Sequence, residues 1–356
     1  MTQPTIVSIQ VLRGLAALLV VGFHLEIVLG KYGAGPFAFG APPSHADSGV
    51  DLFFVLSGFV MTTIAAGRYG SPAAAGQFLF RRAWRIVPLY WLYTTLVVAI
   101  MLLAPGMANS SSPGQSILAS YLLWPQQQLP VLTVGWTLVH EAFFYLVMAA
   151  VIAFARERLL PWILLCWALL TVAAHAWPPA SSTPWARLLS NPLSLEFIAG
   201  ALAGLYWRRL PGGLGLPLVL AGVLGFIGSL YWLHGKPPAE LPVLLRVLHF
   251  GLPAALLVLG AVIHENTAAA RFPRLLAGIG DSSYSLYLSH VFVISLAGRL
   301  WMASGWNQTP LQYALFAGAT LAACVAAGWL SWRLLEQPLQ ALVRRPRRPQ
   351  AIGQAA

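Results

Sequence analysis

The stretch VLRGLAALLVVGFHLEIVLG, residues 11–30, is apolar enough to cross a lipid bilayer, yet it contains an arginine, a histidine and a glutamate. An apolar helix of about 20 residues spans the hydrocarbon core, which is roughly 30 Å thick. An arginine near the centre of such a helix costs about 3 kcal/mol even on lenient insertion scales. The presence of Arg13 and His24 in this run therefore needs an explanation.

The composition of the whole chain is that of a polytopic membrane protein. Of its 356 residues, 58% are hydrophobic and 9% are charged, whereas a soluble domain has about 25% charged residues. The net charge of +11 does not indicate nucleic-acid binding, because the basic residues lie between apolar runs rather than on one soluble face. Cys166 and Cys324 both lie inside apolar runs, so neither a disulfide framework nor a metal cluster is indicated.

Ten apolar runs predict an all-α bundle of about ten transmembrane helices. Segments rich in Gly, Pro, Ser and Asn separate the runs and favour turns. The predicted spans cover approximately residues 8–30, 49–67, 84–104, 133–155, 159–177, 191–207, 214–233, 243–264, 281–303 and 311–335. We expect one transmembrane domain, residues 1–338, followed by a basic, disordered cytoplasmic tail, residues 339–356.

Arginines gather in every second connection between these spans. They are Arg68, Arg81, Arg82 and Arg85; Arg156 and Arg158; Arg208 and Arg209; Arg271 and Arg274; and Arg344, Arg345, Arg347 and Arg348. The positive-inside rule then places both termini in the cytoplasm. A cleaved signal peptide is the alternative for the first run, but its length, its polar residues His24 and Glu26 and the lack of a clean cleavage site favour retention.

Arg13 and His24 share one face of the first predicted helix at two depths. They are eleven positions apart, which amounts to about 20° in azimuth and roughly 16 Å in height. Taken singly, Arg13 could reach lipid headgroups and His24 could be a packing residue. Because the two residues share one face, it is less favoured that both have only these structural roles. The shared face instead indicates a functional pair.

Two further stretches carry polar groups near the ends of spans. Asp51 is expected in the first turn of the second span, where the helix dipole favours a carboxylate and a partner His or Arg could be held. Ser57 and Gly58 in the same span are interpreted as positions of close helix packing. Arg82 and Arg85, at i and i+3, form a pair suited to binding a phosphate from the cytosol.

Later spans add a carboxylate and a polar stripe. Glu141 opens the fourth span, with Tyr145 one turn further on. Ser283, Tyr287 and His290 follow each other at steps of four and three residues, so they lie on one face of the ninth span. A helix that faced only lipid would not carry such a stripe.

Six blocks of the chain, taken in order over about residues 9–338, resemble the membrane-bound acyltransferase-3 family. They are LRGLAALLVVGFH, GVDLFFVLSGFVM, RRAWRIVPLYW, GWTLVHEAFFYL, SYSLYLSH and LEQPL. The first two blocks and VGWTL are most similar in sequence to the exopolysaccharide-acetylating branch. The resemblance implies an O-acyltransferase of a bacterial cytoplasmic (inner) membrane. It would move an acyl group, usually acetyl, from cytosolic acetyl-CoA to a hydroxyl of an exopolysaccharide or another cell-surface glycan or glycolipid.

The resemblance also implies roles for individual residues. On the family's motif positions fall Arg13, His24, Arg82, Arg85, Glu141, Tyr287 and His290. We interpret His24, Glu141 and His290, together with Asp51, as candidates for catalysis, with His24 as the base, because imidazole titrates near neutral pH. Proton abstraction by His24 and transient acylation of His24 are both open from the sequence. Arg13, Arg82, Arg85 and Tyr287 are the candidates for binding coenzyme A. No metal and no nucleic acid are expected, the lipid bilayer is a partner, and the sequence gives no oligomeric state.

Two other classes of function are open at this point. A secondary transporter could use intramembrane His, Glu and Arg side chains as a proton relay, but it would predict inverted repeats and broken helices in paired halves, which are not evident. A structural or regulatory membrane component would predict no pair of ionisable residues on one helix face. The order of the six blocks favours the enzyme. Some relatives have a fused extracytoplasmic esterase-like domain, whereas here a basic tail follows the last predicted span. We therefore expect transfer to be completed by the membrane domain or by a separate protein.

Overall fold

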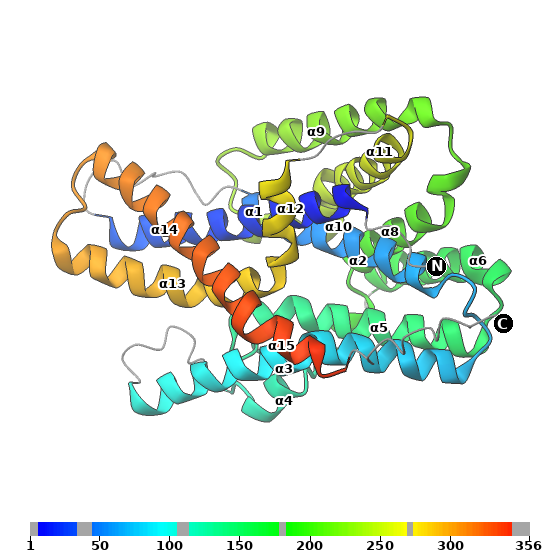
Figure 1. Ribbon diagram of the computed structural model, residues 1–356, viewed down its shortest axis with the longest axis horizontal. Coiled ribbons are helices and arrows are strands. Elements are labelled where there is room, and N and C mark those ends of the chain that lie inside the picture. The colour runs from blue at the N-terminus through cyan, green and yellow to red at the C-terminus, as the bar shows by residue number, and fades with distance from the viewer. Residues whose placement is uncertain (1–5, 34–44, 105–113, 178–182, 269–272, 344–356) are drawn as a thin grey trace, which may run out of the picture.

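The computed structural model describes residues 6–33, 45–104, 114–177, 183–268 and 273–343. In these ranges the chain is helical and forms no β-strand, and ten helical segments are long and apolar enough to cross a membrane. Most of them lie along the long axis of the molecule, which is horizontal in Figure 1. The predicted all-α, ten-span architecture is confirmed.

The longer helices are α1 (Val7–Tyr32), α2 (Gly49–Ala65), α3 (Pro72–Leu103), α5 (Trp136–Phe154), α6 (Leu160–Ala176), α8 (Ser194–Tyr206), α9 (Gly215–Trp232), α11 (Leu252–Ala268), α13 (Ser283–Ser304) and α14 (Pro310–Ser331). The short helices are α4 (Ile117–Tyr121), α7 (Pro184–Leu189), α10 (Val243–Arg246), α12 (Arg274–Asp281) and α15 (Gln337–Ala341). Two short helices form one candidate membrane span with the longer helix that follows them: α7 with α8, and α10 with α11.

The predicted start of the third span, residue 84, is wrong by twelve residues, because α3 begins at Pro72. Ser71 caps this helix, since its side-chain oxygen accepts a hydrogen bond from the Ala74 amide at 3.2 Å. Proline is well suited to the first helical position. The hydropathy of this extension is lowered by its arginines, so Arg82 and Arg85 lie well inside a helix rather than at its start.

The end of the chain also differs from a simple span-and-tail arrangement. A π-helical turn, Trp332–Glu336, joins α14 to α15, so the last helix reaches Ala341. Residues 344–356 of the predicted tail, with their four arginines, and Arg271 lie outside the described residues. Because the chain crosses ten times, α1 begins and α15 ends at the same end of the bundle (Figure 1). The orientation of that end towards the cytoplasm remains a prediction.

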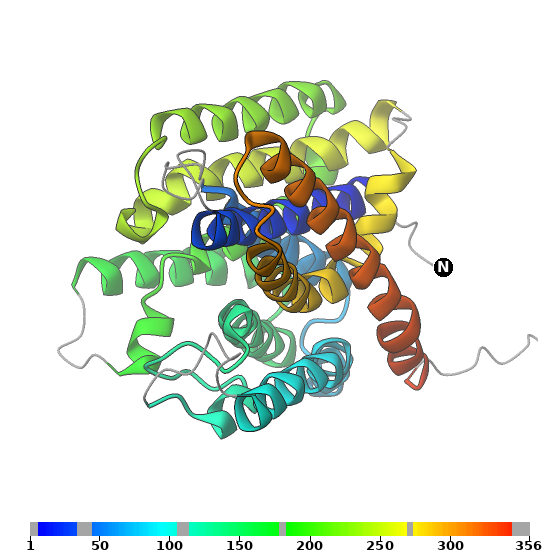
Figure 2. The same cartoon turned by 90° about the vertical axis from the view of Figure 1, so that its left-hand side faces the viewer.

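Helix α1 lies at the centre of the bundle. It packs against α2, α12 and α13, and Figure 2 shows it between the pair α9–α11 and the helices α3 and α5. Helices α2 and α8 pack closely because Gly58 faces the backbone of α8, where a Cβ atom would lie 2.8 Å from the Ala201 amide nitrogen. The interpretation of Gly58 as a packing position is therefore confirmed. This core brings α1, α2, α3, α5 and α13 around one internal space.

Candidate active site

A cavity, called here the central cavity, lies between α1, α2, α3, α5 and α13 and has about 820 Å³ of empty space, including its open mouth. Five of the eight predicted site residues line it, from four different helices. They are Arg13, Arg82, Arg85, Glu141 and Tyr287. Residues that are far apart in the sequence thus meet in one space, whereas His24, Asp51 and His290 do not line it.

Three arginines supply positive charge to the central cavity and form no direct ion pair with any described residue. In the part of the chain that the structure describes, no carboxylate lies within 4 Å of the guanidinium nitrogens of Arg13, Arg82 or Arg85. The Arg82 guanidinium instead lies 5.8 Å from the ring centroid of Phe78 and 5.9 Å from that of Tyr145. Partly buried cations without an ion-pair partner favour an anionic ligand, and arginine pairs bind phosphate with good geometry.

Glu141 is fixed in the wall of the cavity by two hydroxyl groups. Ser57 on α2 donates to its carboxylate at 3.0 Å, and Tyr145, one helical turn further along α5, donates to the same oxygen. Ser57, which the sequence analysis assigned to helix packing, therefore also lines the cavity and holds a functional candidate. These bonds place one negative charge opposite the arginines.

Tyr287 connects the central cavity to a histidine pair. Its hydroxyl donates to the carbonyl of Val134 at 3.0 Å and lies 2.8 Å from Oγ1 of Thr137, which ties α13 to the start of α5. Its ring centroid lies 5.9 Å from that of His290. Tyr287 thus stands between the cavity and the imidazoles.

His24 and His290 form this pair, with Nε2 of His290 3.3 Å from Nδ1 of His24. Nδ1 of His24 lies 2.9 Å from the Val20 carbonyl, and Nδ1 of His290 lies 3.1 Å from the Leu286 carbonyl. Because a carbonyl only accepts, each neutral ring carries its proton on Nδ1. His290 Nε2 then accepts from His24, and the lone pair of His24 is on Nε2.

This arrangement presents His24 as a base. Among the described contacts, its Nε2 has no hydrogen-bond partner, and the side chain is half-buried, whereas His290 is fully buried. Neither imidazole borders the central cavity. Across the described ranges, no group of three or more His, Cys, Asp or Glu side chains is arranged to hold a metal ion.

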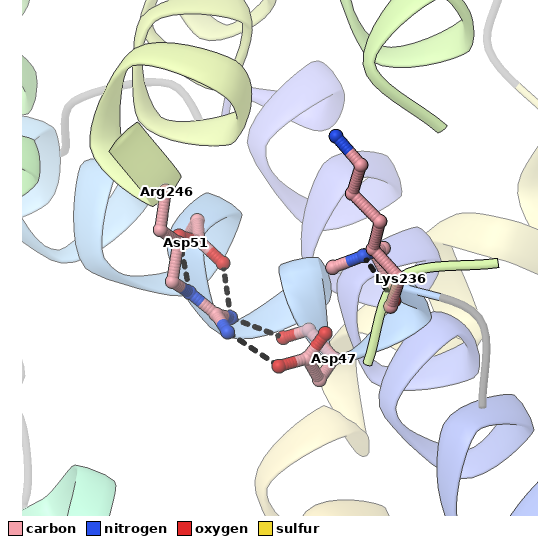
Figure 3. A network of polar contacts seen from close by, with 5 residues as sticks. Asp47, Asp51, Lys236 and Arg246 are labelled. Carbon is pink, nitrogen blue, oxygen red and sulfur yellow. Dashed lines mark hydrogen bonds and ion pairs between the residues drawn. The ribbon is translucent and has the colours of Figure 1, made fainter. Parts of the chain in front are cut away.

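Asp51 lies away from these groups, in an ion-pair network with Arg246 (Figure 3). Arg246 donates from Nε to one Asp51 carboxylate oxygen at 2.9 Å and from a terminal nitrogen to the other at 2.6 Å. It also binds the side chain and, at 3.0 Å, the carbonyl of Asp47. Of the two partners that the sequence analysis allowed for Asp51, the structure supplies the arginine, and it brings Asp51 neither to His24 nor into the central cavity.

The sequence analysis missed two charged residues of this region. Arg246 was given no role, although a lone arginine beside a long apolar run was a usable signal. Glu336 lies in the quoted block LEQPL but was given no role. It is buried, accepts a hydrogen bond from Ser285 at 2.6 Å, and acts electrostatically on Arg13 and Arg85. It therefore balances part of the positive charge from behind the cavity.

Comparisons with known proteins agree with this geometry. The acyltransferase-3 family model, described as an acyltransferase domain, matches residues 6–329. The exopolysaccharide production protein ExoZ of Rhizobium meliloti (strain 1021) is 34% identical over 303 residues, which are 82% of this chain and 89% of that protein.

A second relative is YrhL of Bacillus subtilis (strain 168), provisionally described as a peptidoglycan O-acetyltransferase. It is 25% identical over 327 residues, covering 80% of this chain and 48% of YrhL. No solved structure matches the chain. With a family model that covers nearly all of the ten-span bundle, the transporter and structural alternatives have no support. The chain belongs to the acyltransferase-3 family and is an integral membrane O-acyltransferase.

Proposed function

We propose that this enzyme transfers an acetyl group from cytosolic acetyl-CoA to a hydroxyl of a carbohydrate, such as an exopolysaccharide, at a bacterial cytoplasmic (inner) membrane. The observation that carries the donor assignment is the set of three arginines without ion-pair partners in the central cavity. Coenzyme A carries phosphates that such a set would bind. The positive-inside rule predicts that the arginine-bearing first half of α3 faces the cytosol, where acetyl-CoA is made.

The shape of the cavity supports entry of the donor arm. Arg82 and Arg85 line it from α3, and Tyr287 and Thr137 line it from α13 and α5. With the phosphates on the arginines, the flexible arm of coenzyme A would lie along the cavity, and its thioester would pass Tyr287 to reach His24. Apolar side chains, among them Phe53 and Leu56, make up much of the wall and would exclude water.

The reaction requires a base for the acceptor hydroxyl. Nε2 of His24 takes the proton while the hydroxyl oxygen attacks the thioester carbonyl, so a C–O bond forms and the C–S bond breaks. The departing thiolate takes the proton back from the His24 imidazolium. While His24 is charged, its Nδ1–H donates to the Val20 carbonyl and to Nε2 of His290, and these acceptors stabilise the cation.

The names of the relatives support a carbohydrate acceptor. One is an exopolysaccharide production protein, and the other is provisionally described as acetylating peptidoglycan. Both kinds of polymer offer hydroxyl groups outside the cytoplasm. His24 lies past the middle of α1, towards Tyr32, which is the end of the helix that the predicted topology places away from the cytosol.

Mass analysis of surface glycans tests the proposal. A deletion strain should lose O-acetyl groups that the wild-type gene restores, and the purified protein should bind acetyl-CoA. Unchanged O-acetylation in the deletion strain, or a purified protein that does not bind acetyl-CoA, would contradict the proposed reaction.

A further inference from the structure

A second cavity, called here the lateral cavity, opens on the other face of α5. It encloses about 840 Å³, including its open mouth. Residues 124–130, the start of α5 and the segment 184–191 form its walls, and the lining includes Trp124, Gln128, Trp136, His140, Arg187 and Asn191. We infer that the lateral cavity binds a saccharide segment of the acceptor glycan, an inference that rests on the proposed function.

Helix α5 places this cavity next to the reaction site. Thr137 and Glu141 lie four residues apart and face the central cavity, whereas Trp136 and His140, each one position earlier, face the lateral cavity. One residue turns a helix by about 100°, so the same two turns of α5 serve both spaces. Thr137 also contacts the hydroxyl of Tyr287, which adjoins the histidine pair. A glycan held in the lateral cavity would thus lie beside the end of the central cavity nearest His24.

The predicted topology places the lateral cavity on the acceptor side. Segment 124–130 lies in the connection after α3, and residues 184–191 begin the sixth candidate span directly after the connection that follows α6. The positive-inside rule assigns both connections to the outer side. Among the arginines of the central cavity, Arg13 lies in the first third of α1, and Arg82 and Arg85 lie in the first half of α3, which are the parts of these helices that the predicted topology places towards the cytosol. Donor and acceptor would therefore approach from opposite sides of the membrane.

Aromatic rings give the lateral cavity flat apolar surfaces. Trp124 is 53% exposed although it is a large apolar side chain, and its ring packs edge-to-face on Trp185 with centroids 5.0 Å apart. Trp136 lines the opposite wall. Rigid indole rings with a polar edge suit the C–H faces of pyranose rings, which are apolar but bordered by hydroxyl groups.

An unpaired acceptor in the wall points to a hydroxyl ligand. Nδ1 of His140 lies 3.1 Å from the Trp136 carbonyl, so it donates and leaves a lone pair on Nε2. This Nε2 is buried and has no hydrogen-bond partner. A buried polar atom is normally paired, and a sugar O–H would supply the missing donor.

Two side-chain amides add further hydrogen-bonding groups to the lateral cavity. Asn191 accepts a hydrogen bond from the Leu193 amide at 3.0 Å through its side-chain oxygen, so its NH₂ group can donate to a sugar oxygen. Gln128 adds an exposed amide at the mouth. A few such polar groups among apolar walls are typical of small-molecule sites.

The charge of the lateral cavity restricts the charge of the sugar that it can bind. Among the described residues, its lining contains one cation, Arg187, which binds Gln127, and no acidic residue. A neutral or anionic sugar is therefore favoured over a cationic amino sugar. Because Arg187 is the single cation in the lining, a polyphosphate such as coenzyme A is less suited to this cavity than to the central one.

The experiment compares Trp124→Ala and His140→Leu with the control Trp232→Ala, whose side chain is 69% exposed on α9 and lines neither cavity. The acceptor probe is a set of oligosaccharides from the chemically de-O-acetylated exopolysaccharide of the strain that encodes the protein. For both lateral-cavity variants we expect the apparent KM for the oligosaccharides to rise by about tenfold, which corresponds to about 1.4 kcal/mol. Binding of acetyl-CoA should stay within about twofold of wild type, as should every property of the control.

The outcomes separate the two proposals. If wild-type protein binds acetyl-CoA and transfers acetyl groups, but neither variant changes the acceptor KM, the lateral cavity is not the acceptor site. If wild-type protein does not bind acetyl-CoA, the proposed function itself fails. Oligosaccharide binding without donor, measured by tryptophan fluorescence, should be lost in Trp124→Ala. If phosphatidylglycerol headgroup analogues bind in place of the oligosaccharides, the cavity holds lipid and the inference is overturned.

Discussion

Nε2 of His290 lies 3.3 Å from Nδ1 of His24, although 266 residues separate the two in the chain. The contact joins α13 to α1 and leaves Nε2 of His24 as the lone pair available to a substrate. His290 is itself fixed, because its Nδ1 donates to Leu286 and its ring is fully buried. The proposed base thus has an orienting partner that is another imidazole rather than the carboxylate expected from the usual pairing of His with Asp or Glu.

Replacing His24 by Ala should abolish acetyl transfer, because it removes the imidazole whose Nε2 is the proposed acceptor of the hydroxyl proton. We expect a loss of at least about a hundredfold in kcat, the usual contribution of a general base. Transfer from radiolabelled acetyl-CoA and protein abundance in the membrane are measured together. His175→Ala, at an exposed position of α6, is the matched control and should behave as wild type. Near-normal transfer in His24→Ala would remove His24 from the mechanism.

His290 is a positioning residue, so its loss should lower kcat and spare donor binding. In His290→Ala the Val20 carbonyl still holds His24, and we expect kcat to fall by about tenfold, as for one lost hydrogen bond. The KM for acetyl-CoA should not change, because His290 does not line the central cavity. His290→Gln, which keeps an acceptor, should recover part of kcat. A raised donor KM with unchanged kcat would contradict this role.

Arg82→Lys and Arg85→Lys should weaken acetyl-CoA binding by at least several-fold. Lysine keeps the charge and the predicted topology but loses the planar guanidinium, which costs about 1–2 kcal/mol of a charge-assisted contact. Titration of purified protein with acetyl-CoA gives the affinities. The control is Arg81→Lys, because Arg81 is exposed and lies outside the cavity. Equal affinities in all three variants would leave Arg82 and Arg85 as topology signals alone.

Arg246→Ala should destabilise the fold, because it leaves the carboxylates of Asp47 and Asp51 without their cation. Breaking a buried ion pair in this way costs about 3–5 kcal/mol. Thermal unfolding in detergent measures the effect, with the exposed Arg208→Ala as control. Asp51→Asn should likewise lower the unfolding temperature, whereas its kcat should stay close to that of wild type. A stable but inactive Asp51→Asn protein would instead support the catalytic role first considered for Asp51.

Cysteine labelling checks the topology on which the donor side depends. Arg68 and His234 are both exposed and lie in connections of opposite predicted location. In a Cys166→Ser background, Arg68→Cys should resist a membrane-impermeant maleimide in intact cells and react after lysis. His234→Cys should react in intact cells. Cys324 is fully buried and should stay unlabelled as an internal reference. The reverse pattern would move the acetyl-CoA site to the outer side.

Local patterns in the sequence determined the spans and several neighbours within them. Hydropathy identified ten helices, because each must be apolar over the thickness of the bilayer whatever its neighbours are. Helical periodicity placed Tyr145 one turn from Glu141, where it donates a hydrogen bond. The same periodicity placed Arg82 and Arg85 on one face, and both line the central cavity.

Tertiary structure alone decided which spans bring their polar groups together. Asp51 has the same local signal whether its partner is His24 or Arg246, and only the packing of α10 near the start of α2 selects the arginine. Likewise, Glu336 lies behind Arg13 and Arg85 only because α14 continues through a π-helical turn beside α13. Periodicity fixes the direction of a side chain about its own helix axis. The rotation and neighbours of each helix in the bundle depend on close packing between residues hundreds of positions apart.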